Sequence, residues 1–177
     1  MIETAIETER LMLRGWRDFD RDPFFALNSD PEVMQYLPAG DRASSDAAVD
    51  NLMRTEAEHG HCFWAVERKA DGAFVGFCGS MPAREPLGEV EVGWRLRRDA
   101  WGHGYASEGA RASLAWCWAH LDTPSVMAIT VPANVRSRAV MERIGMAYVE
   151  GGDFDHPSLP AGDPLSRHVL YRIFRPT

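Results

Sequence analysis

The chain has 177 residues, of which 45% are hydrophobic and 25% are charged, and its formal net charge is −7 at pH 7. This length and composition favour one globular domain over residues 1–177. The acidity argues against nucleic acid as the main partner, because phosphate binding requires a basic face, and it is compatible with a cationic substrate such as an amine.

The chain shows no signal for a membrane, a secretory route or a metal. No run approaches 18 consecutive apolar residues, so no membrane span is expected. Residues 1–4 have neither a basic start nor an apolar segment, so no secretory signal is predicted. Cys62, Cys78 and Cys117 share no metal-ligand spacing and read as reduced thiols. We therefore expect a cytoplasmic protein without a metal site, and the sequence leaves both a monomer and a homodimer open.

Four elements are predicted before the first hairpin. They are a strand over residues 6–14, a short helix after Asp18–Asp20, a helical turn from Ser29–Pro31 and a helix ending by Gly60. Ser44 or Ser45 is expected to cap the last of these helices. Residues 61–67 and 74–81 then form a hairpin, because the Asp71–Gly72 step favours a tight turn.

The central stretch changes its period from two to about 3.6. The first part is a predicted strand, in which Val90, Val92 and Trp94 alternate with Glu89, Glu91 and Gly93. The second part is a predicted helix with an apolar stripe at Ala106, Ala110, Leu114, Cys117 and Leu121. A turn with the sequence WGHGY, residues 101–105, joins the two.

That turn is typical of an anion site. Backbone N–H groups in the first turn of a helix lack intrahelical partners, and the helix dipole adds positive charge there. Gly102 and Gly104 permit positive φ and close backbone approach, and Arg97 and Arg98 can add bidentate phosphate contacts. The alternative is an ordinary turn with solvated arginines.

Two nucleotide-binding motifs are excluded by the residues present. A dinucleotide fingerprint needs a third glycine where Ser107 stands. A P-loop needs a lysine after its second glycine, and the only lysine of the chain is Lys69.

The remaining elements complete a pattern of strands and helices. They are a strand over 125–131, a helix from Asn134 to Ile144 that stops at Gly145, a strand over 146–150 and a last strand over 169–174. The 16 residues between the last two strands, 151–166, contain three Gly and three Pro without periodicity. A loop of this length in a compact domain is usually functional or disordered.

Four segments together resemble the GNAT N-acetyltransferases, in the branch related to RimJ and RimL. They are TERLMLR at 8–14, NSDPEVM at 28–34, WRLRRDAWGHGYASEGA at 94–110 and NVRSRAVMERIGM at 134–146. The resemblance spans nearly the whole chain in the right order. It implies an α/β (α+β) fold, a mixed and mostly antiparallel sheet of about seven strands with helices on both faces. Asp99 stands where the family prefers Arg or Gln, and Arg97 and Arg98 are expected to replace that charge.

The resemblance implies an acetyl-CoA-dependent N-acetyltransferase that moves acetyl directly to a primary amine, either a protein N-terminal α-amine or a small-molecule amine. The implied co-substrate site comprises Trp94, Arg95 and Leu96 for pantetheine, Gly102, His103, Gly104, Tyr105, Ala106 and Ser107 for the diphosphate, and Asn134, Ser137 and Arg138. Ser137 would also lie near the sulfur as a proton donor. The N-terminal helical region and residues 151–166 would form walls of the acceptor cleft, with Trp16, Phe24, Met34 and Tyr36 as candidates.

The general base remains open at this point. Glu91 precedes the pantetheine segment, and Glu89 shares its face of the strand. Asp153, Asp155 and His156 are rivals from the long loop, and deprotonation through water without a single base is a third route. Deprotonation at pH 7 costs about 4.6 kcal/mol for a lysine amine and about 1.4 kcal/mol for an α-amine. A site without a strong base therefore suits an α-amine better.

Two other classes of function remain as alternatives. One is a hydrolase built from Ser137, His156 and Asp155, although the chain lacks the G-x-S-x-G elbow. The other is a non-catalytic acyl-CoA-binding or interaction module on the same fold.

Overall fold

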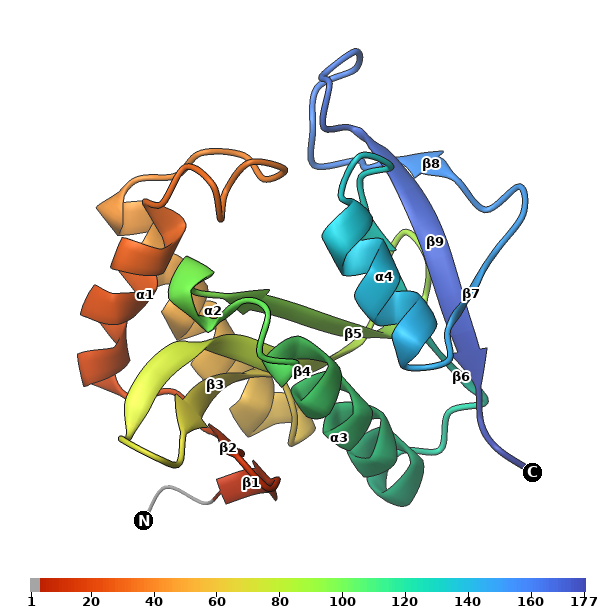
Figure 1. Cartoon of the computed structure of the whole chain (residues 1–177). Helices are drawn as coiled ribbons and strands as arrows, with labels where there is room; N and C mark the ends of the chain where they lie inside the picture. Colours follow the sequence, from red (N-terminus) through yellow and green to blue (C-terminus); the bar gives the residue numbers. More distant parts are fainter. Residues whose placement is uncertain (1–3) are drawn as a thin grey trace.

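The computed structural model describes residues 4–177, which form a nine-stranded sheet in the order β1-β2-β3-β4-β5-β6-β9-β7, with β8 paired to β9 (Figure 1). The strands are β1 Thr4–Glu7, β2 Leu11–Arg14, β3 Phe63–Arg68, β4 Ala73–Arg84, β5 Glu89–Leu96, β6 Ser125–Thr130, β7 Ala147–Tyr148, β8 Phe154–Asp155 and β9 Arg167–Phe174. The β5–β6 pair is parallel, and the other strand pairs of the described residues are antiparallel.

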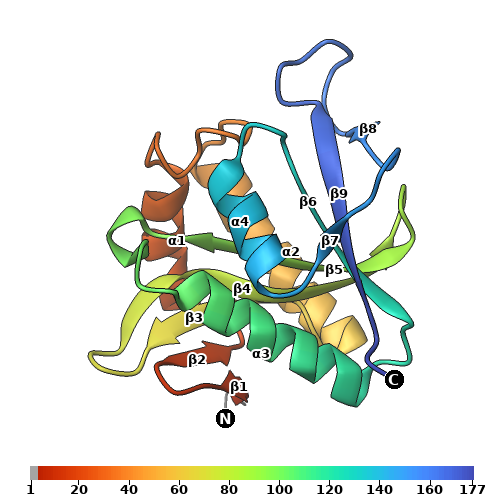
Figure 2. The same cartoon turned by 45° about the vertical axis from the view of Figure 1, so that its right-hand side comes forward.

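Helices cover both faces of this sheet. They are α1 Arg21–Asn28, α2 Arg42–His59, α3 Tyr105–His120 and α4 Val135–Arg143, with short turns η1 Asp18–Asp20 and η2 Arg98–Ala100. Neighbouring residues of β4 point to opposite faces. Phe77 packs against Phe24 of α1, with ring centroids 6.1 Å apart, whereas Cys78 Sγ lies 3.8 Å from Ser113 Oγ of α3. Figure 2 shows α2 behind the sheet and α3 in front, which confirms the expected layers.

The N-terminal region differs from the prediction in two places. The predicted strand over 6–14 is two strands, because Thr8 makes a turn in which its N–H donates to Leu11 O at 2.9 Å. With β8 inside the long loop, this division gives nine strands where about seven were expected. Asp41 caps α2 in place of Ser44 or Ser45: its carboxylate accepts from the Ser44 N–H at 2.8 Å, and its own N–H donates to Ser44 Oγ at 2.9 Å.

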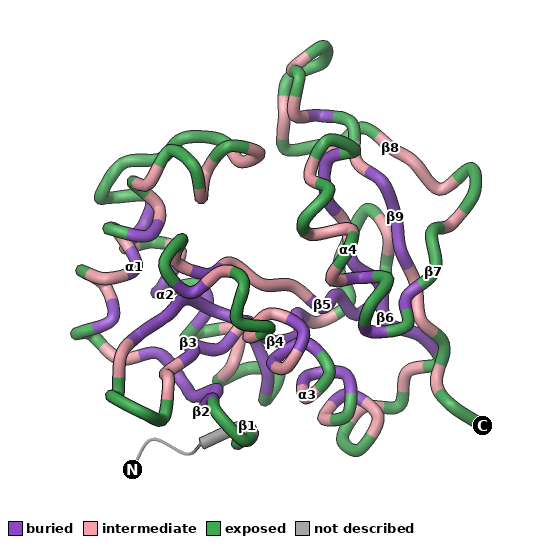
Figure 3. Tube along the Cα trace, in the orientation of Figure 1, coloured by how far each residue is buried: buried purple, intermediate pink, exposed green. Residues whose placement is uncertain are grey.

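The core lies between the middle strands and the helices on either side. Figure 3 shows the buried residues along β3, β4, β6 and β9 and on the inner side of α3. Trp64, Val66, Val75, Val92 and Val126 are almost completely buried. The predicted hairpin and the predicted helix after Gly104 are confirmed as β3–β4 and α3. This packing fixes the central strand against which the site is built.

The sheet opens beside that central strand. Strands β5 and β6 pair only at Val90↔Val126 and Glu91↔Met127. Past Glu91, β5 continues to Leu96 along β4, while β6 continues along β9. The two strands therefore diverge, and the edge of β5 from 92 to 96 has no neighbour on the β6 side among the described residues. Figure 1 shows β5 and α4 on the two sides of this fork.

Candidate active site

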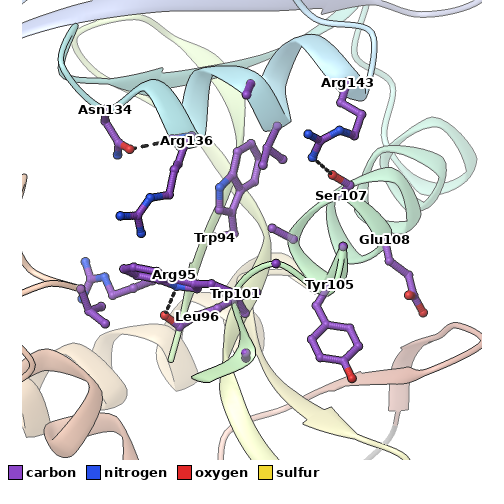
Figure 4. Close-up of a pocket in the computed structure, with 18 of the residues that line it drawn as sticks. Trp94, Arg95, Leu96, Trp101, Tyr105, Ser107, Glu108, Asn134, Arg136 and Arg143 are labelled. Carbon is purple, nitrogen blue, oxygen red and sulfur yellow. Dashed lines mark hydrogen bonds between the residues drawn. The ribbon is translucent and has the colours of Figure 1, made fainter. Parts of the chain in front are cut away.

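A cleft of about 1240 Å³ occupies the fork (Figure 4). Its walls come from β5, the turn into α3, the first turn of α3, the face of α4 and residues 32–37. Of the residues predicted to bind the co-substrate, those lining it are Trp94, Arg95, Leu96, Gly102, Gly104, Tyr105, Ala106, Ser107, Asn134 and Ser137. The structure thus brings the two ends of the predicted site, more than 30 positions apart in the chain, to one cavity.

The turn before α3 presents free donors to this cleft. Gly102 and Gly104 adopt φ of 77° and 80°, the left-handed region that favours glycine. The first backbone bond across the helix start runs from the Glu108 N–H to Gly104 O. Within residues 4–177, no hydrogen bond engages the N–H groups of residues 102–107. This row of amides, at the positive end of a 16-residue helix, is suited to bind an oxyanion.

The arginines at the end of β5 do not face the cleft. Arg97 pairs with Asp99, Nη2 to Oδ2 at 2.6 Å, and donates from Nη1 to Phe74 O at 3.0 Å. Arg98 pairs with Glu32 at 2.6 Å. Neither arginine lines the cavity. Asp99 therefore neutralises one of the guanidiniums that were expected to replace the charge missing at its own position.

Two more predicted residues lie outside the cavity lining. His103 is exposed, and its ring stacks on Tyr105 with centroids 5.5 Å apart. Arg138 turns away from the fork, because its Nε donates to Tyr171 Oη at 3.1 Å and its Nη1 to Pro132 O at 3.0 Å. Arg138 thereby joins α4 to β9 and to the end of β6.

Besides Arg95, and Arg10, which pairs with Glu108, three further arginines bring positive charge to the cleft. Arg111 of α3 and Arg136 and Arg143 of α4 line it, and no carboxylate of the described chain lies within 4.0 Å of them. Arg143 Nη1 lies 3.1 Å from Ser107 Oγ, and the Arg136 guanidinium stacks 4.1 Å above the Trp101 ring. Figure 4 shows Arg136 and Arg143 projecting from α4 toward the turn.

Sequence reasoning missed these arginines. Positions 136 and 143 are seven apart and therefore share a helix face, which is the one signal that the sequence carried. Only the packing of α4 across the fork reveals that this face meets the glycine turn.

A second cavity of about 180 Å³ adjoins the first at the closed end of the fork. Both cavities are lined by Trp94, Arg95, Asn134, Ser137, Val33, Tyr36 and Leu37. The smaller one adds Glu91, Gly93 and His168, together with neighbouring apolar residues. Among the candidate wall residues, Tyr36 lines both cavities, whereas Trp16 and Phe24 are core and Met34 lines neither.

Glu91 is the acidic group of this smaller cavity. Its side chain is 12% exposed, and Oε2 lies 2.9 Å from Arg84 Nη2. Burial raises the pKa of Glu91 above its ordinary value, and the neighbouring Arg84 offsets part of that rise. A carboxylate with a raised pKa is the better proton acceptor near neutral pH.

Glu89 does not compete for that role. Its carboxylate accepts from Arg172 Nε at 2.8 Å and from Ser125 Oγ at 3.0 Å. The hydrogen bond from Arg172 holds the pKa of Glu89 below its ordinary value. Glu89 therefore ties β5 to β9 and does not line either cavity.

The long loop 151–166 lies to the side of the site. None of its residues lines the two cavities, and its expected role as an acceptor wall finds no support in this geometry. Asp153 accepts a hydrogen bond from Tyr148 Oη at 2.8 Å. The contribution of this region comes from His168, which follows the loop on β9 and donates from Nδ1 to Ser166 O at 2.9 Å.

The hydrolase arrangement is not assembled. His156 Nδ1 lies 2.6 Å from Ser158 Oγ, and Asp155 pairs with Arg167 at 3.5 Å. Ser137 lies on α4 and makes no hydrogen bond with either. Burial, His168 and Arg84 together lower the pKa of His156.

Residues 4–177 were also compared with the requirements for a membrane-spanning helix, a metal site and a reactive thiol. None of their helices combines the length and apolarity needed to cross a bilayer, and no three potential metal ligands cluster among them. Cys62, Cys78 and Cys117 are buried free thiols, and burial raises the pKa of Cys78 to about 12.

Comparison with known proteins gives one consistent result. Residues 10–147 match the model of the acetyltransferase (GNAT) domain family. The chain is 35% identical over 149 residues to the protein YkkB of Bacillus subtilis, covering 82% of this chain and 87% of that one. It is 30% identical over 157 residues to the FsC-acetyl coenzyme A-N(2)-transacetylase of Aspergillus fumigatus, covering 84% and 67%. A solved acetyltransferase from Agrobacterium tumefaciens superposes with a TM-score of 0.79 at 28% identity, covering 98% and 95%.

Proposed function

This chain belongs to the GNAT acetyltransferase family, and we propose that it moves the acetyl group of acetyl-CoA directly to a primary amine, either a protein N-terminal α-amine or a small-molecule amine. The main support is the row of unengaged N–H groups at 102–107, which opens into a cleft leading to Glu91.

The described residues fit acetyl-CoA. The amides of 102–107 and the guanidiniums of Arg136 and Arg143 provide donors and positive charge for the diphosphate. The free edge of β5 at 94–96 can hydrogen-bond the pantetheine amides as a neighbouring strand does. Asn134 lies across the fork, where its Oδ1 accepts from the Ser137 N–H at 3.3 Å.

When bound, the co-substrate supplies a thioester carbonyl that an amine can attack. The chain itself then has to accept one proton and to donate another. The two residues proposed for these steps, Glu91 and Ser137, both line the smaller cavity. Glu91 accepts the proton that the amine must lose, and Ser137 donates a proton to the departing thiolate through its hydroxyl. A positioned general base or acid contributes about 10²–10⁴-fold to a rate. No acyl-enzyme is required, which agrees with the unassembled Ser137–His156 pair.

We also propose that the chain acts as one domain and falls in the RimJ/RimL-like branch. Two of the motifs that support this assignment contact each other: Thr8 Oγ1 donates to Glu108 Oε1 at 2.6 Å, and the Arg10 N–H donates to the same oxygen at 2.9 Å. The opening strand thereby fixes the first turn of α3 and the amides that it presents.

The test is release of free CoA thiol from acetyl-CoA on addition of an amine panel containing peptides with free N-termini, amino acids and polyamines. Calorimetric titration with CoA accompanies it. Turnover with at least one amine, with acetylation confirmed by mass spectrometry, is the expected result. CoA binding without transfer to any amine would favour the non-catalytic module, and absence of CoA binding would overturn both.

A further inference from the structure

Arg95 lies on β5 where the two cavities meet, and its positive charge has no carboxylate partner among the described residues. It lines both cavities. Its Nη1 donates to Asn28 Oδ1 at 2.6 Å, and its guanidinium lies 5.1 Å from the centre of the Phe77 ring. The buried Nε has no hydrogen-bond partner, and no carboxylate of residues 4–177 lies within 4.0 Å of the guanidinium.

Arg14 is the contrasting case of a buried arginine that the chain itself neutralises. Arg14 is almost fully buried, and Asp20 and Glu67 neutralise it at 2.8 and 2.9 Å. Burial lowers the pKa of Arg95 to about 10, and no neighbouring anion offsets that effect. Burying an unpaired charge costs free energy. A side chain kept in this state beside a cavity is placed to receive an anion from outside the chain.

The neighbours of Arg95 define a pocket floor with opposite charges at its two ends. Glu91, Gly93 and Arg95 are alternate residues of β5 and share one face, with the Cα atoms of Glu91 and Arg95 about 13 Å apart at about 3.3 Å per residue. A Cβ at Gly93 would lie 2.8 Å from Phe63 Cζ, so the Phe63 ring, which also lines this cavity, packs over the strand between the two charges. Tyr36 faces this floor from the N-terminal wall.

We propose that the acceptor carries an oxyanion group, a carboxylate or a phosphate, which Arg95 binds while the amine of the same molecule faces Glu91. This inference rests on the proposed acetyl transfer. The co-substrate leaves the Arg95 side chain free, because its pantetheine is assigned to the main chain of 94–96 and its diphosphate to the amides of 102–107. The planar guanidinium matches an oxyanion with two parallel N–H groups.

The experiment compares matched acceptors with and without the anion. Straight-chain amino acids with one to five carbons between amine and carboxylate are assayed beside their primary amides, and aminoalkylphosphonates form a separate arm. At saturating acetyl-CoA, we expect kcat/KM of the wild-type protein to favour the best carboxylate or phosphonate over its uncharged partner at least tenfold. Which arm shows the larger ratio distinguishes the two sources of oxyanion.

Arg95→Gln should reduce that ratio to about one, mainly through KM, and leave the Kd for CoA within about twofold. Arg54→Gln, on the exposed side of α2, is the control and should keep the wild-type ratio. Arg95→Lys keeps the charge without the planar fork and should retain a reduced preference. If circular dichroism shows that Arg95→Gln does not fold, the preference of Arg95→Lys for charged acceptors is the test: a reduced ratio supports the inference and an unchanged ratio contradicts it.

Equal use of acids, phosphonates and amides by the wild-type protein would overturn the inference, and so would an unchanged ratio in a folded Arg95→Gln. Failure to acetylate any amine would instead overturn the proposed function. In that case titration of the same pairs into CoA-loaded protein still decides about Arg95. Binding of the charged member alone, lost in Arg95→Gln, supports the oxyanion site, and equal binding or none refutes it.

Discussion

Glu91→Gln removes the proton acceptor and keeps the shape of the side chain, so it separates chemistry from folding. We expect kcat/KM for the best amine to fall at least tenfold, which corresponds to about 1.4 kcal/mol of transition-state stabilisation. The acid limb of the wild-type pH profile should lie above pH 4.5, the ordinary pKa of glutamate, because burial raises the pKa of Glu91. That limb should disappear in the variant.

The stability of Glu91→Gln should not fall together with its activity. Because the pKa of Glu91 is raised in the folded state, the protonated form is favoured by folding, and that contribution is lost as the pH rises through the folded pKa. The ion pair lost with the variant involves Arg84, which is 52% exposed, and such pairs contribute about 0.2–1 kcal/mol. At pH 8 we therefore expect a Tm within about 3 °C of wild type, with no loss specific to the buried carboxylate.

The matched control is Glu89→Gln, two residues away on the same strand. The pKa of Glu89 is lowered by Arg172, so its contribution to stability is present above its unfolded pKa and is lost as the pH falls through its folded pKa. This variant should lower the Tm at pH 7 and leave kcat/KM within about threefold. Wild-type kcat/KM in Glu91→Gln, measured by thiol release from pH 5 to 9, would remove Glu91 from the mechanism.

Further predictions concern the co-substrate site and the loop. Gly104→Val should weaken CoA binding at least tenfold in calorimetry, because it places a branched side chain at a φ of 80° beside the free amides. Gly162→Val is the control: it has the same backbone strain at a φ of 81° and should leave the Kd for CoA unchanged. Arg143→Ala should raise the Kd for CoA about tenfold, and Arg97→Ala less than twofold, since only Arg143 lines the cleft; equal effects would contradict this assignment. His156→Ala should keep kcat/KM within about twofold, and a larger loss would restore the loop to the mechanism.

The parts of the site that the sequence predicted are local. The strand, the glycine turn and the helix over 89–120 follow from a change of period and from two glycines with positive φ, all within about 30 residues. The free amides at 102–107 follow from the same segment, because a helix start leaves its donors unpaired whatever surrounds it.

The parts that the sequence did not predict depend on contacts between distant segments. Arg98 is paired by Glu32, 66 positions away, and Arg143 reaches Ser107 across 36 positions. The sequence therefore does not distinguish an arginine that pairs with a carboxylate from one that lines a cleft, because the residue type is the same and the partner lies far away in the chain. His168 was missed for the same reason, since it lines the site only because β9 lies beside β6.

The different fates of Glu89 and Glu91 follow from register. The β5–β6 pairing places Glu91 beside Met127, whereas Ser125, two residues earlier on β6, reaches Glu89. Ser125 has a hydroxyl that donates to Glu89 at 3.0 Å, and together with Arg172 it satisfies that carboxylate. Met127 offers Glu91 no hydrogen bond, and the strands separate at the next residue, so the carboxylate of Glu91 is left at the vertex of the fork with Arg84 as its partner. A shift of β6 by two residues would place Ser125 beside Glu91, so the identity of the base is a property of strand pairing that alternation along β5 alone does not determine.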